Sequence, residues 1–178
     1  MTENPTDFAR WQDASETWGE KHPLRSQIAA RFIGHGKSVL DLGAGSMVLK
    51  KFLPPDCRYQ PCDIYPRSPE CLVADLNAQQ FPAGHYDWVV MLGVFQFLTD
   101  PAWAVAQCRQ VAEQAVFSYS PTIRDQPTAK EIEWREGEGW VNHYNYSQYL
   151  SIISQGGWEI SNIFKIPANF VVICRAAK

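Results

Sequence analysis

The end of the chain carries the strongest constraint on its fold. Two strand-like segments, residues 158–166 and 169–176, are separated only by Pro167 and Ala168. A connection this short can join only antiparallel neighbours. The earlier strand-like segments alternate with helix-like segments, which is typical of parallel strands joined by helical crossovers. The sequence therefore predicts an α/β fold with a mixed seven-stranded sheet that ends in an antiparallel hairpin.

The remaining elements are read from hydrophobic periodicity and from proline and glycine positions. The other strands are expected over residues 37–42, 57–63, 70–76, 86–92 and 115–120. Helices are expected over residues 46–54, 99–114 and 147–155, and residues 7–32 are expected to be helical in two pieces. The run YDWVVML at 86–92 is almost continuously apolar, which favours a central strand covered by helices on both faces.

The length of 178 residues favours a single domain that covers residues 1–178. Residues 1–36 are expected to form an N-terminal helical cap. Residues 121–146 begin with a charged and irregular stretch, and we expect them to form a lid or insertion over a site.

Charge and composition narrow the classes of partner. The net charge of -3 gives no general attraction to nucleic acid, so no nucleic-acid partner is expected. No apolar run is long enough to span a membrane, and the polar N-terminus is unlike a secretory signal, which favours a cytoplasmic location. The 5 cysteines are scattered without a Cys-x-x-Cys pair, which indicates reduced thiols in the core and no metal site. The oligomeric state is not predicted.

A glycine turn follows the first strand, in the segment SVLDLGAGSM at residues 38–47. Turns of this kind between a strand and a helix hold nucleoside triphosphates, dinucleotides or S-adenosylmethionine. The triphosphate pattern fails because its GHGKS segment precedes the strand and Arg31 occupies its first glycine position. The dinucleotide pattern is weakened because Val48 stands where its third glycine belongs.

The turn resembles the first motif of class I S-adenosylmethionine-dependent methyltransferases, a family with a Rossmann-like three-layer sandwich fold. Within it, the chain is similar to small methyltransferases of type 11/12. The segments VLDLGAG, DLN and FPAGHYDWVV also resemble methyltransferase-like proteins of bacterial methionine biosynthesis. The resemblance implies S-adenosyl-L-methionine as the cofactor. The residues to which it assigns cofactor binding are Asp41, Gly43, Ala44, Gly45, Asp63, Ile64, Ala74, Asp75, Leu76, Leu92 and Gly93.

Aspartates at three strand ends carry most of the implied contacts. The resemblance places Asp41 near the cofactor's amino group, Asp63 on the two ribose hydroxyls and Asp75 on the adenine amino group. It also implies that Ile64 packs against the adenine and that the backbone N–H of Leu76 donates to the ring. Ligands of open α/β sheets gather at the carboxyl ends of strands, in agreement with this placement. Each aspartate taken alone is equally well explained as a turn or capping residue.

The segment after the strand at 86–92 extends the resemblance but also departs from it. Leu92 and Gly93 fall where the family's chain passes the methionine arm of the cofactor. Gln96 and Phe97 stand where many relatives carry Glu-His, and Met47 replaces a frequent glycine of the first motif. A catalytic histidine at position 97 is therefore absent.

The candidate catalytic residue is His143, in the polar and aromatic run GWVNHYNYS that ends the predicted lid. Methyl transfer depends mainly on aligning the reactants, and a general base helps when the acceptor carries a proton. The alternative for His143 is a loop histidine with a satisfied hydrogen bond. Trp140, Tyr144 and Tyr146 are candidates for an acceptor pocket, or for packing that anchors the loop.

The N-terminal segment supplies further candidates. Trp11 and Trp18 lie in a region that folds over the cofactor in many relatives, and Arg25 is a candidate partner of the methionine carboxylate. The alternative for Arg25 is a solvated helix face.

The leading hypothesis for function is transfer of a methyl group to a small-molecule or glycan/lipid-precursor acceptor, because the compact chain carries no appended docking domain. The first alternative is a non-catalytic methyltransferase-like protein that binds the cofactor or a protein partner. A second is transfer of another group, such as aminopropyl, for which the chain lacks a strongly acidic pocket.

Overall fold

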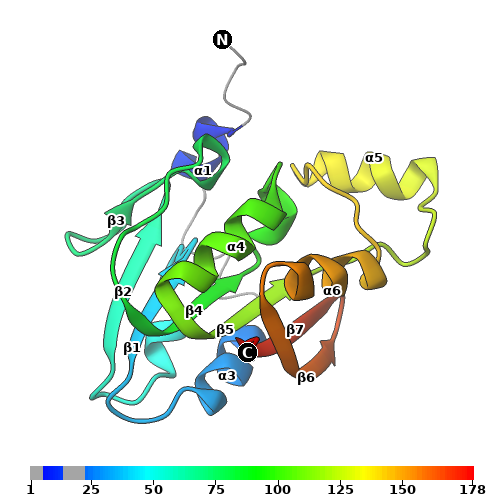
Figure 1. Ribbon diagram of the computed structural model, residues 1–178. Coiled ribbons are helices and arrows are strands. Elements are labelled where there is room, and N and C mark those ends of the chain that lie inside the picture. The colour runs from blue at the N-terminus through cyan, green and yellow to red at the C-terminus, as the bar shows by residue number, and fades with distance from the viewer. Residues whose placement is uncertain (1–5, 14–22) are drawn as a thin grey trace.

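The computed structural model describes residues 6–13 and 23–178. Its central feature is a seven-stranded sheet with the strand order β3-β2-β1-β4-β5-β7-β6 (Figure 1). The strands are β1 (Ser38–Leu42), β2 (Arg58–Asp63), β3 (Leu72–Val73), β4 (Tyr86–Leu92), β5 (Ala112–Tyr119), β6 (Trp158–Ile166) and β7 (Asn169–Ala176). Strands β1 to β5 are parallel, and β7 pairs antiparallel with both β5 and β6. The predicted mixed sheet with its terminal hairpin is confirmed.

Helices cover both faces of the sheet and make the three layers. They are α3 (Pro23–Phe32) with the 3₁₀ turn η1 (Leu49–Lys51) on one face, and α4 (Pro101–Val111) with α6 (Tyr146–Gln155) on the other. Alternate strand residues divide between the two faces, as strand geometry requires. Val39 and Val90 pack with Ile28 of α3, whereas Leu40 and Val89 belong to the core under α4 and α6.

The predicted helix over residues 46–54 is wrong. Only the three residues of η1 are helical there, in 3₁₀ geometry. Met47 has a φ of 54°, a left-handed conformation that an α-helix does not contain. The remaining stretch before Pro54 and Pro55 is too short for a stable helix of its own.

Two other predicted elements have different bounds. The strand expected over 70–76 is reduced to β3, the two residues Leu72 and Val73 at the edge of the sheet. A very short edge strand exposes few unpaired backbone groups to other chains. The helix expected over 99–114 ends at Val111, and β5 begins directly at Ala112.

The predicted lid contains a helix that the charge pattern obscured. Helix α5 (Ala129–Gly137) is capped at its N-terminus by Thr128, whose hydroxyl accepts a hydrogen bond from the backbone N–H of Glu131 at 3.3 Å. This Thr-x-x-Glu spacing is a helix-start signal that the sequence does contain. At the other end of the chain, α1 (Phe8–Asp13) and α3 represent the two expected N-terminal helical pieces, and Trp18 lies outside the described residues.

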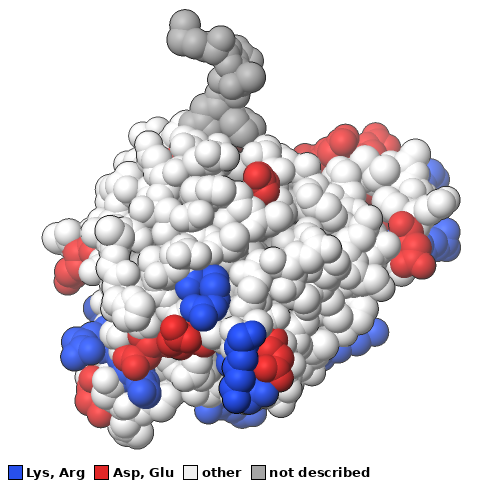
Figure 2. Space-filling model, viewed as in Figure 1, with Lys and Arg blue, Asp and Glu red and all other residues white. Residues whose placement is uncertain are grey.

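None of the helices within residues 6–13 and 23–178 has the length and apolar character needed to cross a membrane. All of Cys57, Cys62, Cys71, Cys108 and Cys174 are free thiols, and the first and third of these are only partly buried. On the face shown in Figure 2, basic and acidic side chains lie beside one another in its lower part.

Candidate functional site

A cavity of about 620 Å³ opens at the carboxyl ends of β1, β2 and β4. This volume lies within the range of about 300 to 1,000 Å³ that is typical of small-molecule sites. Every residue that the sequence assigns to cofactor binding lines it: Asp41, Gly43, Ala44, Gly45, Asp63, Ile64, Ala74, Asp75, Leu76, Leu92 and Gly93. The structure therefore brings these separated segments together around one space.

The glycine turn after β1 is fastened to the neighbouring strand. The backbone N–H groups of Gly43 and Ala44 both donate to the carbonyl of Cys62, at 2.8 and 3.1 Å. The N–H of Gly45 donates to Oδ2 of Asp63 at 2.8 Å. Gly43 has a φ of 67°, and a Cβ at this position would overlap Cγ2 of Val94. The turn thus needs glycine at position 43 for both its backbone angle and the space it leaves.

Replacing Gly43 by alanine is expected to lower the free energy of unfolding by about 3 kcal/mol. A left-handed alanine costs about 1–2 kcal/mol, and overpacking against Val94 adds about 1–3 kcal/mol. Urea denaturation of both proteins measures the difference. Gly36→Ala is the matched control, because Gly36 has the same φ of 67° but no atom lies within 4 Å of a Cβ there. Equal losses in the two variants would refute the proposed overlap.

Asp41 is a buried carboxylate at the end of β1, with 4% of its surface exposed. The hydroxyl of Tyr59 donates to its Oδ2 at 2.6 Å. Burial raises the pKa of Asp41 to about 7; the Tyr59 hydrogen bond opposes this shift, and the negative charge of Asp63 adds to it. Near neutral pH this group is therefore poised to gain or lose a proton, and a cation nearby would favour its ionised form.

The burial of Asp41 predicts a pH-dependent stability that Asp41→Asn removes. An unfolded aspartate has a pKa of about 3.9, so between about pH 4 and 7 the folded state retains a proton that the unfolded state releases. The contribution is fully present below about pH 4 and is lost as the pH rises to about 7, by about 1.4 kcal/mol per pH unit.

Urea denaturation at a series of pH values tests this expectation. The Asn variant should become the more stable protein at pH 8, by up to about 4 kcal/mol. A difference between the two proteins that does not change with pH would contradict the raised pKa.

Asp63 and Asp75 face the cavity but also support local structure. Besides the Gly45 N–H, Asp63 accepts the N–H of Tyr65 at 3.3 Å through its Oδ1. Asp75 caps the 3₁₀ turn η2 (Leu76–Ala78), with Oδ1 accepting the N–H of Asn77 and the hydroxyl of Thr6, both at 2.9 Å. The capping role considered for these aspartates and their position on the cavity wall therefore coexist.

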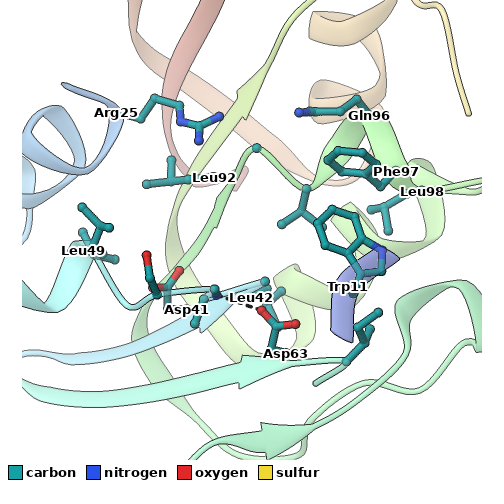
Figure 3. A pocket seen from close by; sticks show the side chains of 18 of the residues that line it. Trp11, Arg25, Asp41, Leu42, Leu49, Asp63, Leu92, Gln96, Phe97 and Leu98 are labelled. Atoms are coloured by element: carbon teal, nitrogen blue, oxygen red, sulfur yellow. Dashed lines mark hydrogen bonds between the residues drawn. The ribbon is translucent and has the colours of Figure 1, made fainter. Parts of the chain in front are cut away.

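Arg25 is a cation in the cavity wall for which residues 6–13 and 23–178 provide no hydrogen-bond acceptor or carboxylate partner. It projects from α3 over Gly93, where a Cβ would overlap its Nη1. Burial lowers the pKa of Arg25. Figure 3 shows Arg25 and Gln96 reaching toward the cavity from opposite sides, while Asp41 and Asp63 lie below them. A half-buried guanidinium with no counter-ion among the described residues favours an anionic ligand group in this space.

Helix α1 covers one side of the cavity. Trp11 lines it and meets the ring of Phe97 edge-on, with 4.6 Å between the ring centroids (Figure 3). The carbonyl of Trp11 accepts a hydrogen bond from Nη2 of Arg67 at 2.7 Å. Nη2 of Arg10 donates to the carbonyl of Glu138 at 2.6 Å and so joins α1 to the lid.

The structure places His143 outside this cavity, beside a smaller hollow of about 400 Å³. Nε of Arg135 donates to its Nδ1 at 3.2 Å, and Glu136 lies 3.8 Å from its Nε2. Arg135 is itself buried and donates to the Ser120 carbonyl and the Tyr119 hydroxyl, both at 2.9 Å. These contacts match the alternative considered for His143, a loop histidine with a satisfied hydrogen bond.

The other lid candidates divide between the cavity and the core. Trp140 lines both spaces. The ring of Tyr144 packs near Phe95, and that of Tyr146 lies 4.6 Å from Phe170; neither tyrosine lines the cavity. Sequence reasoning missed the cavity residues at the end of β5, in the lid and in the last hairpin, and no local motif marks them: Ser120, Trp134, Glu138, Ile166, Pro167, Ala168 and Asn169.

No protein-family model and no curated protein sequence matches this chain significantly. Solved structures do resemble it. The pyocyanin biosynthetic protein PhzM aligns with a TM-score of 0.70 and 14% identity over 96% of this chain, which spans only 61% of PhzM. A second similar structure is a chain from the complex of the Haloferax volcanii methyltransferase activator Trm112 with a candidate methyltransferase. Its TM-score is 0.70 and its sequence identity 13%, and the alignment covers 96% of this chain and 97% of that one.

Magnesium protoporphyrin IX methyltransferase from Synechocystis, solved with bound S-adenosylhomocysteine (SAH), gives a TM-score of 0.62 and 14% identity over 97% of this chain and 89% of its own. Likeness at such identities establishes the fold alone. The chain has the fold of class I S-adenosylmethionine-dependent methyltransferases.

Proposed function

We propose that the chain binds S-adenosylmethionine in the 620 Å³ cavity and transfers its methyl group to a small-molecule acceptor. The observation that carries the proposal is the convergence of Asp41, Asp63 and Asp75 around one space at the strand ends with Arg25, a cation that no described residue neutralises. This donor and acceptor set matches the groups of the cofactor: an ammonium, ribose hydroxyls, an adenine amine and a carboxylate.

Each of these side chains has a distinct task in the proposed complex. Asp41, held by Tyr59, lies at the β1 end, where it would accept the cofactor's ammonium. Arg25 would bind the carboxylate and hold the methionine arm against Gly93. Asp63 would accept the ribose hydroxyls while it keeps the Gly45 turn in place. Asp75 would face the adenine.

Bound S-adenosylmethionine supplies a methyl group already activated by its sulfonium. The chain would then contribute alignment of the acceptor and exclusion of water. Trp11 and Phe97 cover one side of the cavity, and Trp134 and Trp140 of the lid border another. Between β5 and the last hairpin, Glu138 is the one ionisable side chain that the described part of the lid brings to the cavity wall.

The experiment is a titration followed by a turnover assay. Isothermal calorimetry with S-adenosylmethionine and SAH should give dissociation constants in the micromolar range. Incubation with methyl-labelled cofactor and the small-molecule fraction of a cell extract should transfer label into a product. No heat at millimolar cofactor would overturn the proposal.

A second candidate function is cofactor binding without turnover. It is favoured by the position of His143 outside the cavity and by Gln96 and Phe97 in place of Glu-His. In addition, one structural neighbour belongs to a complex with a methyltransferase activator, which supports a protein partner for this fold. Tight cofactor binding with no labelled product from any acceptor fraction would support this candidate over the first.

A further inference from the structure

The cavity continues beyond the strand ends that are proposed to hold the cofactor. Its wall extends onto the end of β5, the lid and the turn between β6 and β7 (residues 166–169). None of the predicted cofactor contacts comes from these segments. If the proposed function is correct, this extension is where the methyl acceptor lies, and its side chains define the chemistry of that acceptor.

The lid side of the extension is aromatic. Trp134 and Trp140 both line it, with 5.3 Å between their ring centroids and 73° between their planes. Trp134 remains 56% exposed, although tryptophan is among the side chains that gain most from burial. Ile166 and Pro167 of the last hairpin also line the cavity. The extension therefore offers apolar surfaces and ring faces that suit a planar ligand.

Apart from Glu138, the polar side chains that border the extension are neutral and partly unsatisfied. Nδ2 of Asn169 donates to Oγ of Ser120 at 2.9 Å. The side-chain oxygens of Asn169 and Gln96 are buried and have no hydrogen-bond partner among the described residues. These two residues are 8% and 5% exposed. Figure 3 shows the amide of Gln96 extending toward the cavity. Rotation of either side chain toward the cavity would bring its amide oxygen to a ligand hydroxyl or N–H group and supply the partner that it lacks.

The charges around the extension disfavour an ionic acceptor of either sign. Glu138 on the lid would repel an anion. A cation would meet the guanidinium of Arg135, a buried residue of the lid. The ring of Trp140 is also already in contact with a cation, because the guanidinium of Arg135 lies 4.6 Å from its centroid.

We infer that the acceptor is a planar, mainly apolar and uncharged molecule that packs against Trp134 and Trp140. A hydroxyl or N–H group on it hydrogen-bonds to the amides of Gln96 and Asn169. The identification of this molecule as the methyl acceptor rests on the proposed function, but its binding can be measured without turnover.

The test uses 2-naphthol as the uncharged planar probe, and calorimetry on the full chain saturated with SAH. The charged probes are 6-hydroxy-2-naphthoate and 2-naphthylmethylammonium. We expect 2-naphthol to bind at least tenfold more tightly than either charged probe. Trp134→Ala should weaken its binding about tenfold and leave SAH binding unchanged, whereas Trp134→Phe should retain most of the affinity. Ile123→Ala is the matched control, because Ile123 is an 89% exposed residue of the lid segment outside the cavity wall.

Two results would overturn the inference: a charged probe that binds as tightly as 2-naphthol, or naphthol binding that Trp134→Ala does not change. Failure of the proposed function has a separate signature. If SAH does not bind but 2-naphthol still binds to the free chain in a Trp134-dependent way, the cofactor assignment is lost and the apolar subsite stands.

Discussion

Asp63→Ala is expected to weaken the binding of SAH about 100-fold. The carboxylate lines the cavity at the end of β2 and already accepts the Gly45 N–H at 2.8 Å. Hydrogen bonds to a charged group contribute about 1.5–3 kcal/mol each, and every 1.4 kcal/mol is a factor of ten in affinity. Loss of the two proposed ribose contacts together with the anchor of the glycine turn is therefore expected to weaken SAH binding by at least two powers of ten, which calorimetry measures.

Two further variants separate ligand contact from loop structure. Asp63→Asn keeps an oxygen that can accept the Gly45 N–H but removes the charge, so an intermediate loss of about tenfold is expected. Asp56→Ala removes an exposed carboxylate near His35 and should leave SAH binding unchanged. If Asp63→Ala bound SAH like the unmodified chain, the ribose assignment would be wrong.

Arg25→Gln is expected to weaken SAH binding by about 30- to 100-fold while changing the binding of 5′-methylthioadenosine less than threefold. The second ligand has the same adenosine and sulfur but lacks the amino-acid arm. Because no described residue neutralises Arg25, its charge is available to the carboxylate of that arm. Charge-assisted, bidentate contacts of this kind are among the strongest hydrogen bonds in proteins.

The free chain provides the control for Arg25→Gln. Burial lowers the pKa of Arg25, which means that the folded protein disfavours this charge when it has no partner. The free energy of unfolding of the ligand-free variant should therefore equal or exceed that of the original chain. Equal losses for both ligands would assign Arg25 to shaping the cavity, and the carboxylate contact would be refuted.

The parts of the fold that follow from local sequence pattern were predictable. The alternation of strand-like and helix-like segments and the two-residue connection at Pro167 and Ala168 predicted a mixed sheet with a terminal hairpin, whereas the strand order comes from the structure. The glycine turn and the aspartates were singled out by their resemblance to methyltransferase motifs, and they line one cavity because parallel strands bring their carboxyl ends to one edge. Their roles toward a cofactor stay predictions.

The errors arose where a residue adopts a conformation, or makes a contact, that its neighbours in sequence do not determine. Met47 resembles a helix residue, but its positive φ prevents the expected helix after the turn. The absence of this helix has a consequence for the site: with no α-helix N-terminus beside the glycines, positive charge for an anion must come from side chains in the cavity wall such as Arg25.

His143 and the residues of the last hairpin illustrate the same limit over longer distances. The contact of His143 with Arg135 depends on how the lid folds back on β5. Asn169 reaches the cavity only because β7 pairs with β5 and places the start of β7 beside the end of β5. Neither arrangement leaves a periodic signal in the chain.

The attachment of α1 also bears on the rates of ligand exchange. This helix of 6 residues is held over the cavity by the Arg10 and Arg67 hydrogen bonds and by the edge contact of Trp11 with Phe97. Interactions of this kind contribute about 0.5–1.5 kcal/mol each, so those within the described residues amount to a few kcal/mol together. Detaching α1 opens one side of the cavity while the sheet stays intact. The residence time of a ligand can therefore be set by a local opening event, on a timescale independent of the global unfolding of the protein.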